Sequence, residues 1–304
     1  MRISTQTLFE TGAARLGDLQ SSLAKTQQQI STGRRILTPA DDPVGAARAL
    51  EVTQSQSINT QYGVNRERAT SALGEVDGVL ASVIELIQNV KTTAIAAGGP
   101  ALGDAERASQ ATGLSASLQQ LVGLANSRDA MGNYLFSGFQ TDTQPFVQTA
   151  TGVSYQGDLG QPLMQVDATR QMAVSSPGQT VFQGGGQDMF KTLADLVTLL
   201  QTPVVTAADQ ANLSAGLAAA NANFEKALDN VSTVRTSVGS RLQELDALDS
   251  AGSDRDLQYS QMLSDLQDLD YTKAITQLSQ QQTTLEAAQQ SFVKTSGLSL
   301  FNYI

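Results

Sequence analysis

The sequence contains no cysteine, no histidine and no tryptophan, and only 5% of its 304 residues are aromatic. Without cysteine the chain can form neither a disulfide nor a thiolate metal site. Without histidine it lacks the commonest general base and metal ligand of proteins. Serines and carboxylates are plentiful, but no serine has a histidine to activate it. We therefore expect no catalytic, cofactor-binding or metal-binding residues and no enzymatic activity.

Long apolar runs and an excess of positive charge are also missing. The formal net charge is −10, which argues against binding to nucleic acid or to an anionic membrane. No stretch approaches the ~18 consecutive apolar residues of a membrane span, and residues 1–20 lack the apolar core of a signal peptide. Taken alone, these absences are typical of a soluble cytoplasmic protein, although they leave open secretion by a route that needs no cleavable signal.

The sequence does contain a seven-residue apolar repeat near each end. A strict repeat of this kind predicts a helix that wraps around a partner helix. The first series has Leu19 at a second seam position between its members, and the second has Ala274 and Ala288 at such positions. We predict that the two segments pair as a coiled-coil assembly face and bring the ends of the chain together. The two series are Phe9, Leu16, Leu23, Ile30 and Leu37, and Tyr271, Leu278, Leu285 and Phe292.

The two repeat segments have an unusual composition. Gly12, Thr26 and Gly33 fall in the first segment and are expected to weaken its seam. From Thr272 to Ile304 only three residues are charged, and the outer positions are mostly Gln, Ser, Thr and Ala. A free helix in water usually has a charged face, whereas small neutral side chains suit packing against copies of the same chain. An ordinary two-helix bundle with a Gln-rich surface remains an open alternative.

Longer helices are expected in the middle of the chain. Apolar residues at three-and-four spacing predict an antiparallel bundle of these helices. Gly63 is a candidate bend in the first of them, and Gly252 is a candidate break in the last. The predicted helices cover residues 43–97, about 103–132, 187–201 and about 207–269.

Two acidic clusters lie next to predicted helix starts. Asp41 and Asp42 precede Pro43, and we interpret Asp42 as a helix N-cap with proline at the first helical position. No third ligand of matching type is near, so capping is preferred to a metal pair. Asp270 ends a second cluster, which we interpret as favouring the start of the last helix. A calcium loop would need more ligands and a turn glycine.

The composition changes in residues 134–186, which are rich in Gly, Pro, Thr and Gln. Short apolar runs at 153–156, 163–168 and 171–175 predict strands. This segment is predicted to be a small β-rich insertion between helices. Because glycine-containing joints flank it, we expect that it can be removed without collapse of the helices.

The fold class is therefore mainly α: a long antiparallel helical bundle with terminal coiled-coil helices paired N to C, plus a small β-rich inserted domain. Three domains are predicted. They are a terminal coiled-coil domain at 1–42 and 264–304, a long helical bundle domain at 43–133 and 187–263, and a small β-rich outer domain at 134–186.

Several blocks of the sequence resemble the bacterial flagellin family. Near the start these are MRIST and QISTGRRI, with PADDP after them. Towards the end they are RTSVGSR at 235–241, DLDYTKAI at 268–275 and the closing run AITQLSQQQTTLEAAQQSFVKTSGLSLFNYI. The stretch GNYLFSGFQTDTQPF at 132–146 is similar to those family members that join the flagellar hook to the filament.

The resemblance implies a structural protein of the bacterial flagellum without enzymatic activity. It implies a subunit of a homo-oligomeric ring between hook and filament, in contact with flagellin and with a second junction protein. It also implies type III export to the cell exterior without a cleaved signal, with an export chaperone at Leu278, Leu285 and Phe292 of the C-terminal helix. Flagellin itself, the main filament subunit, is the alternative. An unrelated coiled-coil binding protein is a more distant one.

Overall fold

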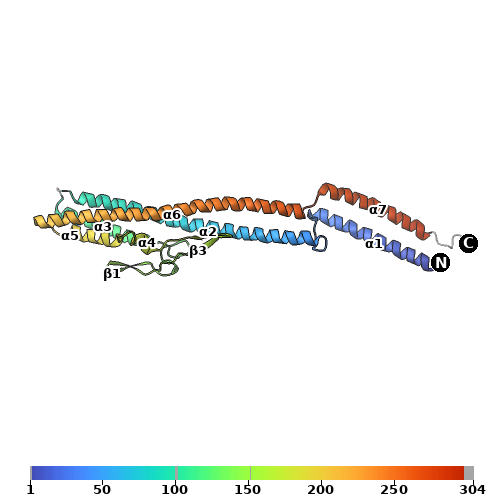
Figure 1. Cartoon of the computed structure of the whole chain (residues 1–304), viewed down its shortest axis with the longest axis horizontal. Helices are drawn as coiled ribbons and strands as arrows, with labels where there is room; N and C mark the ends of the chain where they lie inside the picture. Colours follow the sequence, from blue (N-terminus) through green and yellow to red (C-terminus); the bar gives the residue numbers. More distant parts are fainter. Residues whose placement is uncertain (1, 100–101, 151, 298–304) are drawn as a thin grey trace. The chain divides into compact units, whose positions relative to one another are not determined.

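The computed structural model describes residues 2–99, 102–150 and 152–297. It confirms the predicted fold class, a mainly α antiparallel bundle with paired terminal helices and a small β-rich insertion (Figure 1). Met1 and residues 298–304, which belong to the terminal blocks that resemble flagellin, lie outside the described residues. The helices are α1 (Arg2–Thr32), α2 (Pro43–Ala97), α3 (Asp104–Ala125), α4 (Gly178–Phe182), α5 (Met189–Gln201), α6 (Ala207–Gln267) and α7 (Tyr271–Gly297). The strands are β1 (Phe146–Thr149), β2 (Gly152–Tyr155), β3 (Leu163–Asp167) and β4 (Arg170–Ala173).

The chain forms two compact units. The first combines the residues up to Ile58 with those from Asp254 onward, and the second runs from Asn59 to Ser253. Both α2 and α6 therefore contribute residues to both units. The three-domain division drawn from the sequence remains a prediction.

The two longest helices are uninterrupted. α2 has 55 residues and α6 has 61, and neither ends at its candidate glycine. The break expected at Gly252 is wrong, and the structure gives the reason. Gly252 is buried within α6, and the guanidinium of Arg66 from α2 occupies the space that a side chain at Gly252 would need. This glycine allows close packing of two helices instead of ending one.

Ion pairs in the second unit show how α2 and α6 lie together. Lys91 Nζ lies 2.9 Å from a carboxylate oxygen of Glu225, and Arg235 Nε lies 2.8 Å from one of Asp77. The pair with the higher residue number in α2 has the lower residue number in α6, so the two helices are antiparallel. The prediction that these two helices pack side by side is confirmed.

The core of the second unit is apolar and is built mainly from α2, α3, α5 and α6. Burying one Leu, Val or Phe side chain contributes about 1.5–3 kcal/mol, so this unit has a substantial core of its own. Buried members include Leu73, Val76, Leu80, Val83, Leu114, Leu121, Leu193, Leu196, Phe224 and Val231.

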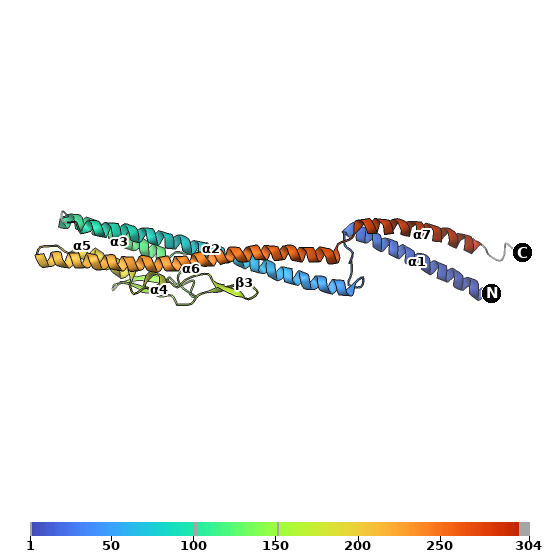
Figure 2. The ribbon, with the colours of Figure 1, turned by 45° about the horizontal axis from the view of Figure 1, so that its top comes forward.

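The insertion consists of two antiparallel hairpins and the short helix α4, which lie along one side of the helices (Figures 1 and 2). Phe146 of β1 is opposite Tyr155 of β2, and Leu163 of β3 is opposite Ala173 of β4. The three predicted strands correspond to β2, β3 and β4. The sequence analysis missed β1, whose two apolar residues are followed by polar ones, and the short helix α4.

Aromatic side chains of the insertion belong to the same core as the helices. Phe136, Phe146 and Phe182 are fully buried. The ring centroids of Phe146 and Phe190, a residue of α5, are 4.9 Å apart, and those of Phe136 and Phe182 are 5.3 Å apart. The insertion therefore supplies part of the apolar interior of the helical body.

Polar side chains of α2 also hold the second hairpin. Asn65 Nδ2 donates a hydrogen bond to the main-chain oxygen of Gln165 at 2.7 Å, and Arg66 Nη1 donates to that of Val166 at 3.2 Å. Together with the shared aromatic core, these bonds argue against the expectation that residues 134–186 can be removed without loss to the helices.

We predict that Phe182→Ala lowers the free energy of unfolding of the helical body by about 3–5 kcal/mol, because it leaves a cavity in a fully buried site. Circular dichroism at 222 nm during denaturant unfolding measures this change. Phe139→Ala is the control, since Phe139 is 66% exposed and its loss should change stability by less than about 1 kcal/mol. Equal effects of the two substitutions would contradict the shared core.

Candidate assembly surface

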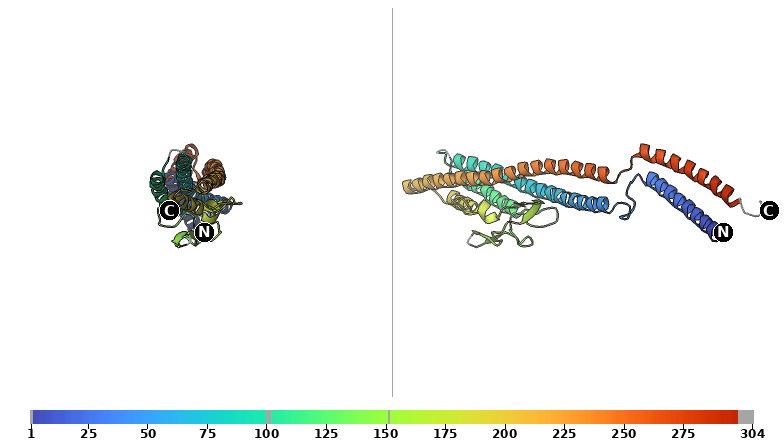
Figure 3. Two further views of the ribbon diagram at one scale, coloured as in Figure 1. Left: turned by 90° about the vertical axis from the view of Figure 1, so that its left-hand side faces the viewer. Right: turned by 45° about the vertical axis from the view of Figure 1, so that its right-hand side comes forward.

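The terminal helices α1 and α7 lie side by side and antiparallel, as predicted (Figures 1 and 3). The ring centroids of Phe9 and Phe292 are 5.1 Å apart. Further along, Gln281 Nε2 lies 2.9 Å from Ser22 Oγ. The start of α1 is therefore beside the end of α7. Sequence analysis missed the Ser22–Gln281 contact, although Gln281 shares the heptad position of the seam residues Ala274 and Ala288.

The predicted seam residues meet, but two helices do not bury them completely. Among seam positions Thr26 and Ala274 are buried, whereas Phe9 is 54% exposed and Tyr271 is 51% exposed. The pair therefore leaves apolar surface uncovered along its length. The half-buried members of the seam are Leu16, Leu19, Leu23, Ile30, Leu278, Leu285 and Phe292.

Leu37 does not belong to the coiled-coil face, which corrects one predicted residue. α1 ends at Thr32, and Gly33 has a positive φ of 70° that turns the chain out of the helix. Leu37 follows in the loop, where its amide donates a hydrogen bond to a carboxylate oxygen of Asp41 at 3.1 Å. The predicted heptad series is therefore one repeat too long.

The loop between α1 and α2 is held by its two carboxylates. Asp41 lies 2.5 Å from Lys25 Nζ and accepts a hydrogen bond from the Thr38 amide. The hydrogen bond from Lys25 is the main cause that lowers the pKa of Asp41 to about 2. Asp42 accepts a hydrogen bond from the Gly45 amide at 2.8 Å, and this bond is the main cause of its lowered pKa. The predicted capping of α2 by Asp42 is confirmed.

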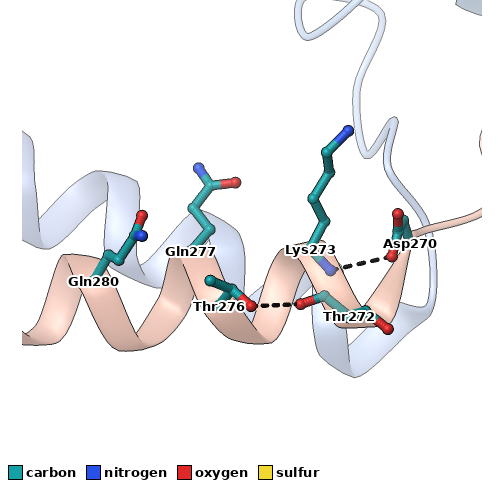
Figure 4. A pocket seen from close by; sticks show the side chains of 6 residues that line it. All are labelled: Asp270, Thr272, Lys273, Thr276, Gln277 and Gln280. Atoms are coloured by element: carbon teal, nitrogen blue, oxygen red, sulfur yellow. Dashed lines mark hydrogen bonds between the residues drawn. The ribbon is translucent and has the colours of Figure 1, made fainter.

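The start of α7 is fixed to the end of α1 by main-chain hydrogen bonds. The amide of Leu269 donates to the oxygen of Gly33 at 2.9 Å, and the amide of Arg35 donates to the oxygen of Gln267 at 2.7 Å. Asp270 then caps α7, because its carboxylate accepts a hydrogen bond from the Lys273 amide (Figure 4). This confirms the role predicted for Asp270 at a helix start.

An open pocket follows on the outer side of α7, and its lining is polar and mostly uncharged (Figure 4). In it the hydroxyl of Thr276 donates to the main-chain oxygen of Thr272, four residues earlier, at 2.9 Å. Thr283, Thr284 and Thr295 bond their own helix in the same way. A hydroxyl already paired within its helix can be covered by another chain without leaving a buried donor unpaired. The lining residues are Asp270, Thr272, Lys273, Thr276, Gln277 and Gln280.

The described residues also bear on metal binding and membrane insertion. They contain no group of three or more acidic residues placed to hold a metal ion. None of the helices in the described ranges combines the length and apolarity that a membrane span requires.

Comparisons with known proteins agree on one family. The family described as bacterial flagellin N-terminal helical region matches residues 3–141. The flagellar hook-associated proteins 3 of Escherichia coli (strain K12) and Salmonella typhimurium (strain LT2) are each 35% identical to this chain over 315 residues, covering 99% of both chains.

Solved structures share the fold. A putative flagellar hook-associated protein from Vibrio parahaemolyticus has a TM-score of 0.69 at 23% identity, and covers 75% of this chain and 100% of its own. Flagellar hook-associated protein 3 from Legionella pneumophila has a TM-score of 0.68 at 18% identity, and covers 71% of this chain and 98% of its own.

We predict that acid loosens the loop between α1 and α2. Because the pKa of Asp41 is lowered from 3.8 to about 2, its contacts stabilise the folded chain above about pH 4 and are lost as the pH falls towards 2. The amide hydrogens of Leu37 and Thr38 should then exchange with solvent faster. The increase, measured by NMR, should exceed the change in the exchange rate of an unprotected amide over the same pH range. Asp41→Asn removes the titrating group, so this variant should lack the change. An identical response of both proteins would contradict the assignment.

Proposed function

The chain belongs to the family of flagellar hook-associated protein 3, and we propose that it is a structural subunit of the junction between hook and filament of the bacterial flagellum. We propose further that its subunits form a homo-oligomeric ring and that the chain has no enzymatic activity. The observation that carries the ring proposal is the incompletely covered α1–α7 pair.

A second face of α7 offers further contacts for another copy of the chain. Ile275 is 56% exposed and Val293 is 67% exposed. They are five full helical turns apart and so lie on the same face of α7. Gln282, Glu286 and Gln289 lie between them on that face. This face therefore offers two separate apolar contact points on a helix of low charge, and no continuous apolar patch.

The low charge of α7 favours a copy of the same chain as the covering partner. Between Tyr271 and Gly297 only three residues are charged. Neutral faces repeat around a closed ring without the repulsion that charged faces of one sign would produce. The threonine hydroxyls bonded within α7 further reduce the cost of burial.

The structure and composition also fit an exported protein that meets several partners. We propose location in the bacterial flagellum, outside the cell, after export without a cleaved signal. The partners proposed there are flagellin and a second junction protein. Before assembly, an export chaperone would cover Leu278, Leu285 and Phe292, which α1 half-buries in the folded chain.

Flagellin is the second candidate, because the matching family region is named for it. The full-length similarity to hook-associated proteins 3 favours the junction role. Expression of this chain in a strain that lacks its own hook-associated protein 3 tests the choice. A junction subunit should restore filament attachment and reduce the flagellin released into the medium. Restoration of filaments instead in a strain that lacks flagellin would overturn the proposal.

We predict that Leu285→Ala combined with Phe292→Ala weakens both chaperone binding and junction assembly. Fully burying one Leu or Phe side chain contributes about 1.5–3 kcal/mol, so their loss removes about 3–6 kcal/mol from a complex that covers both. Binding to the chaperone is measured by titration calorimetry, and assembly by the flagellin that leaks into the medium.

The matched control is Gln282→Ala combined with Gln289→Ala on the exposed face of α7. This variant should bind the chaperone normally and weaken only the contacts between subunits. Normal chaperone binding and normal filaments in the Leu285→Ala, Phe292→Ala variant would show that the seam does not serve both partners.

A further inference from the structure

The terminal helices carry a matched pattern of very small and very large residues. Gly12 and Gly33 are three heptads apart at one end of the chain, and Tyr271 and Phe292 are three heptads apart at the other. The antiparallel arrangement sets Phe292 against Gly12 and Tyr271 against Gly33. We refer to these two contacts as the aromatic–glycine pairs.

A side chain at either glycine would require the facing aromatic ring to move. A Cβ atom at Gly12 would lie 2.8 Å from two ring carbons of Phe292, and one at Gly33 would lie 2.9 Å from Tyr271 Oη. Gly33 is also required by its positive φ of 70°. Gly12 lies inside α1 without such a backbone requirement, so the nearness of Phe292 is the feature that explains it.

The residues between the pairs continue the pattern. Leu19 and Thr26 follow Gly12 at seven-residue intervals before Gly33, and Leu285 and Leu278 precede Phe292 at the same interval. In the observed alignment Leu285 is level with Leu19, and Leu278 is level with Thr26, which is buried. At both ends of the seam an aromatic ring therefore lies against a glycine, and residues of intermediate size meet in the middle. At the Gly12 end the Phe292 ring also contacts Phe9.

A repeat of seven residues does not by itself determine which heptads face each other. A slip of one heptad keeps apolar residues along most of the seam, which makes it the nearest competing arrangement. A slip in one direction sets Phe292 level with Leu19, and a slip in the other sets Tyr271 level with Thr26. Either slip replaces the glycine beneath one ring by a larger residue, so that ring would have to move outward and lose part of its contact with α1.

We propose that the two aromatic–glycine pairs determine the alignment of α1 with α7, each preventing a slip in one direction. Main-chain hydrogen bonds also fix the alignment at the Gly33 end. The Phe292–Gly12 pair therefore contributes more to the alignment at the opposite end of the two helices. Gly12 and Gly33, which were expected to weaken the seam, thus act as the positions at which α1 accommodates the aromatic rings of α7. This inference concerns pairing within one chain and does not depend on ring formation.

The absence of native cysteine allows a direct test on the purified full-length chain. Ser22→Cys with Gln281→Cys reports the observed alignment, because the two native side chains lie 2.9 Å apart. Ser22→Cys with Ala274→Cys or with Ala288→Cys reports the two slipped alignments. Under mild oxidation we expect cross-linking in the first variant and at least about fivefold slower cross-linking in the other two. Equal rates in all three would overturn the proposal.

The glycine is tested by a matched pair of substitutions in the cross-linking background that reports the observed alignment. Gly12→Ala should slow the cross-link about fivefold, although alanine raises helix propensity. Gly17→Ala is the control, because among the described residues no atom lies within 4 Å of a Cβ placed there, and it should not slow the reaction. Phe292→Leu added to Gly12→Ala should restore the rate. Equal effects of Gly12→Ala and Gly17→Ala, or no rescue, would contradict the proposed pairs.

Moving the glycine provides the second test. Gly12→Leu with Leu19→Gly places the small residue one heptad later, where Phe292 would meet it after a slip. In this variant the Ser22→Cys, Ala288→Cys cross-link should become at least about threefold faster than in the native background. No increase would show that residue size at these positions does not determine the alignment.

Discussion

Two helices can bury each other on one side only, and the terminal helices of this chain carry apolar side chains on more than one side. Half-buried leucines line the contact between α1 and α7, and Ile275 and Val293 extend the apolar surface around α7. Ordering a residue costs about 1–2 kcal/mol, and a half-covered seam offsets only part of that cost. We therefore expect the stability of the first unit to depend on what covers the pair.

The second unit does not share this dependence. Its helices enclose a continuous apolar core, and the aromatic residues of the insertion complete that core rather than forming a separate one. A chain with one self-sufficient unit and one dependent unit can remain folded in part before assembly. Completion of the terminal pair can then follow contact with its neighbours. This division suits a structural subunit that, as proposed, is exported first and then assembles into the flagellum.

Much of this architecture follows from periodicity in the sequence. The heptad series predicted the pairing of α1 with α7, and three-and-four spacing predicted the long helices of the bundle. Periodicity does not report on single close contacts, which explains the errors. Gly252 was expected to break α6 because glycine lowers helix propensity, but a buried arginine from another helix requires it. Leu37 fits the repeat, but the backbone leaves the helix at Gly33 before reaching it.

The hydrogen bonds from α2 to the second hairpin have one more consequence. A two-stranded sheet has an unpaired edge on each strand, and such edges invite strand addition by other chains. The side chains of Asn65 and Arg66 occupy the main-chain oxygens of Gln165 and Val166 on β3. These bonds place α2 against β3, so part of this strand is already covered within the chain. The contact with α2 thus leaves less of β3 open to the intermolecular β-pairing that leads to aggregation.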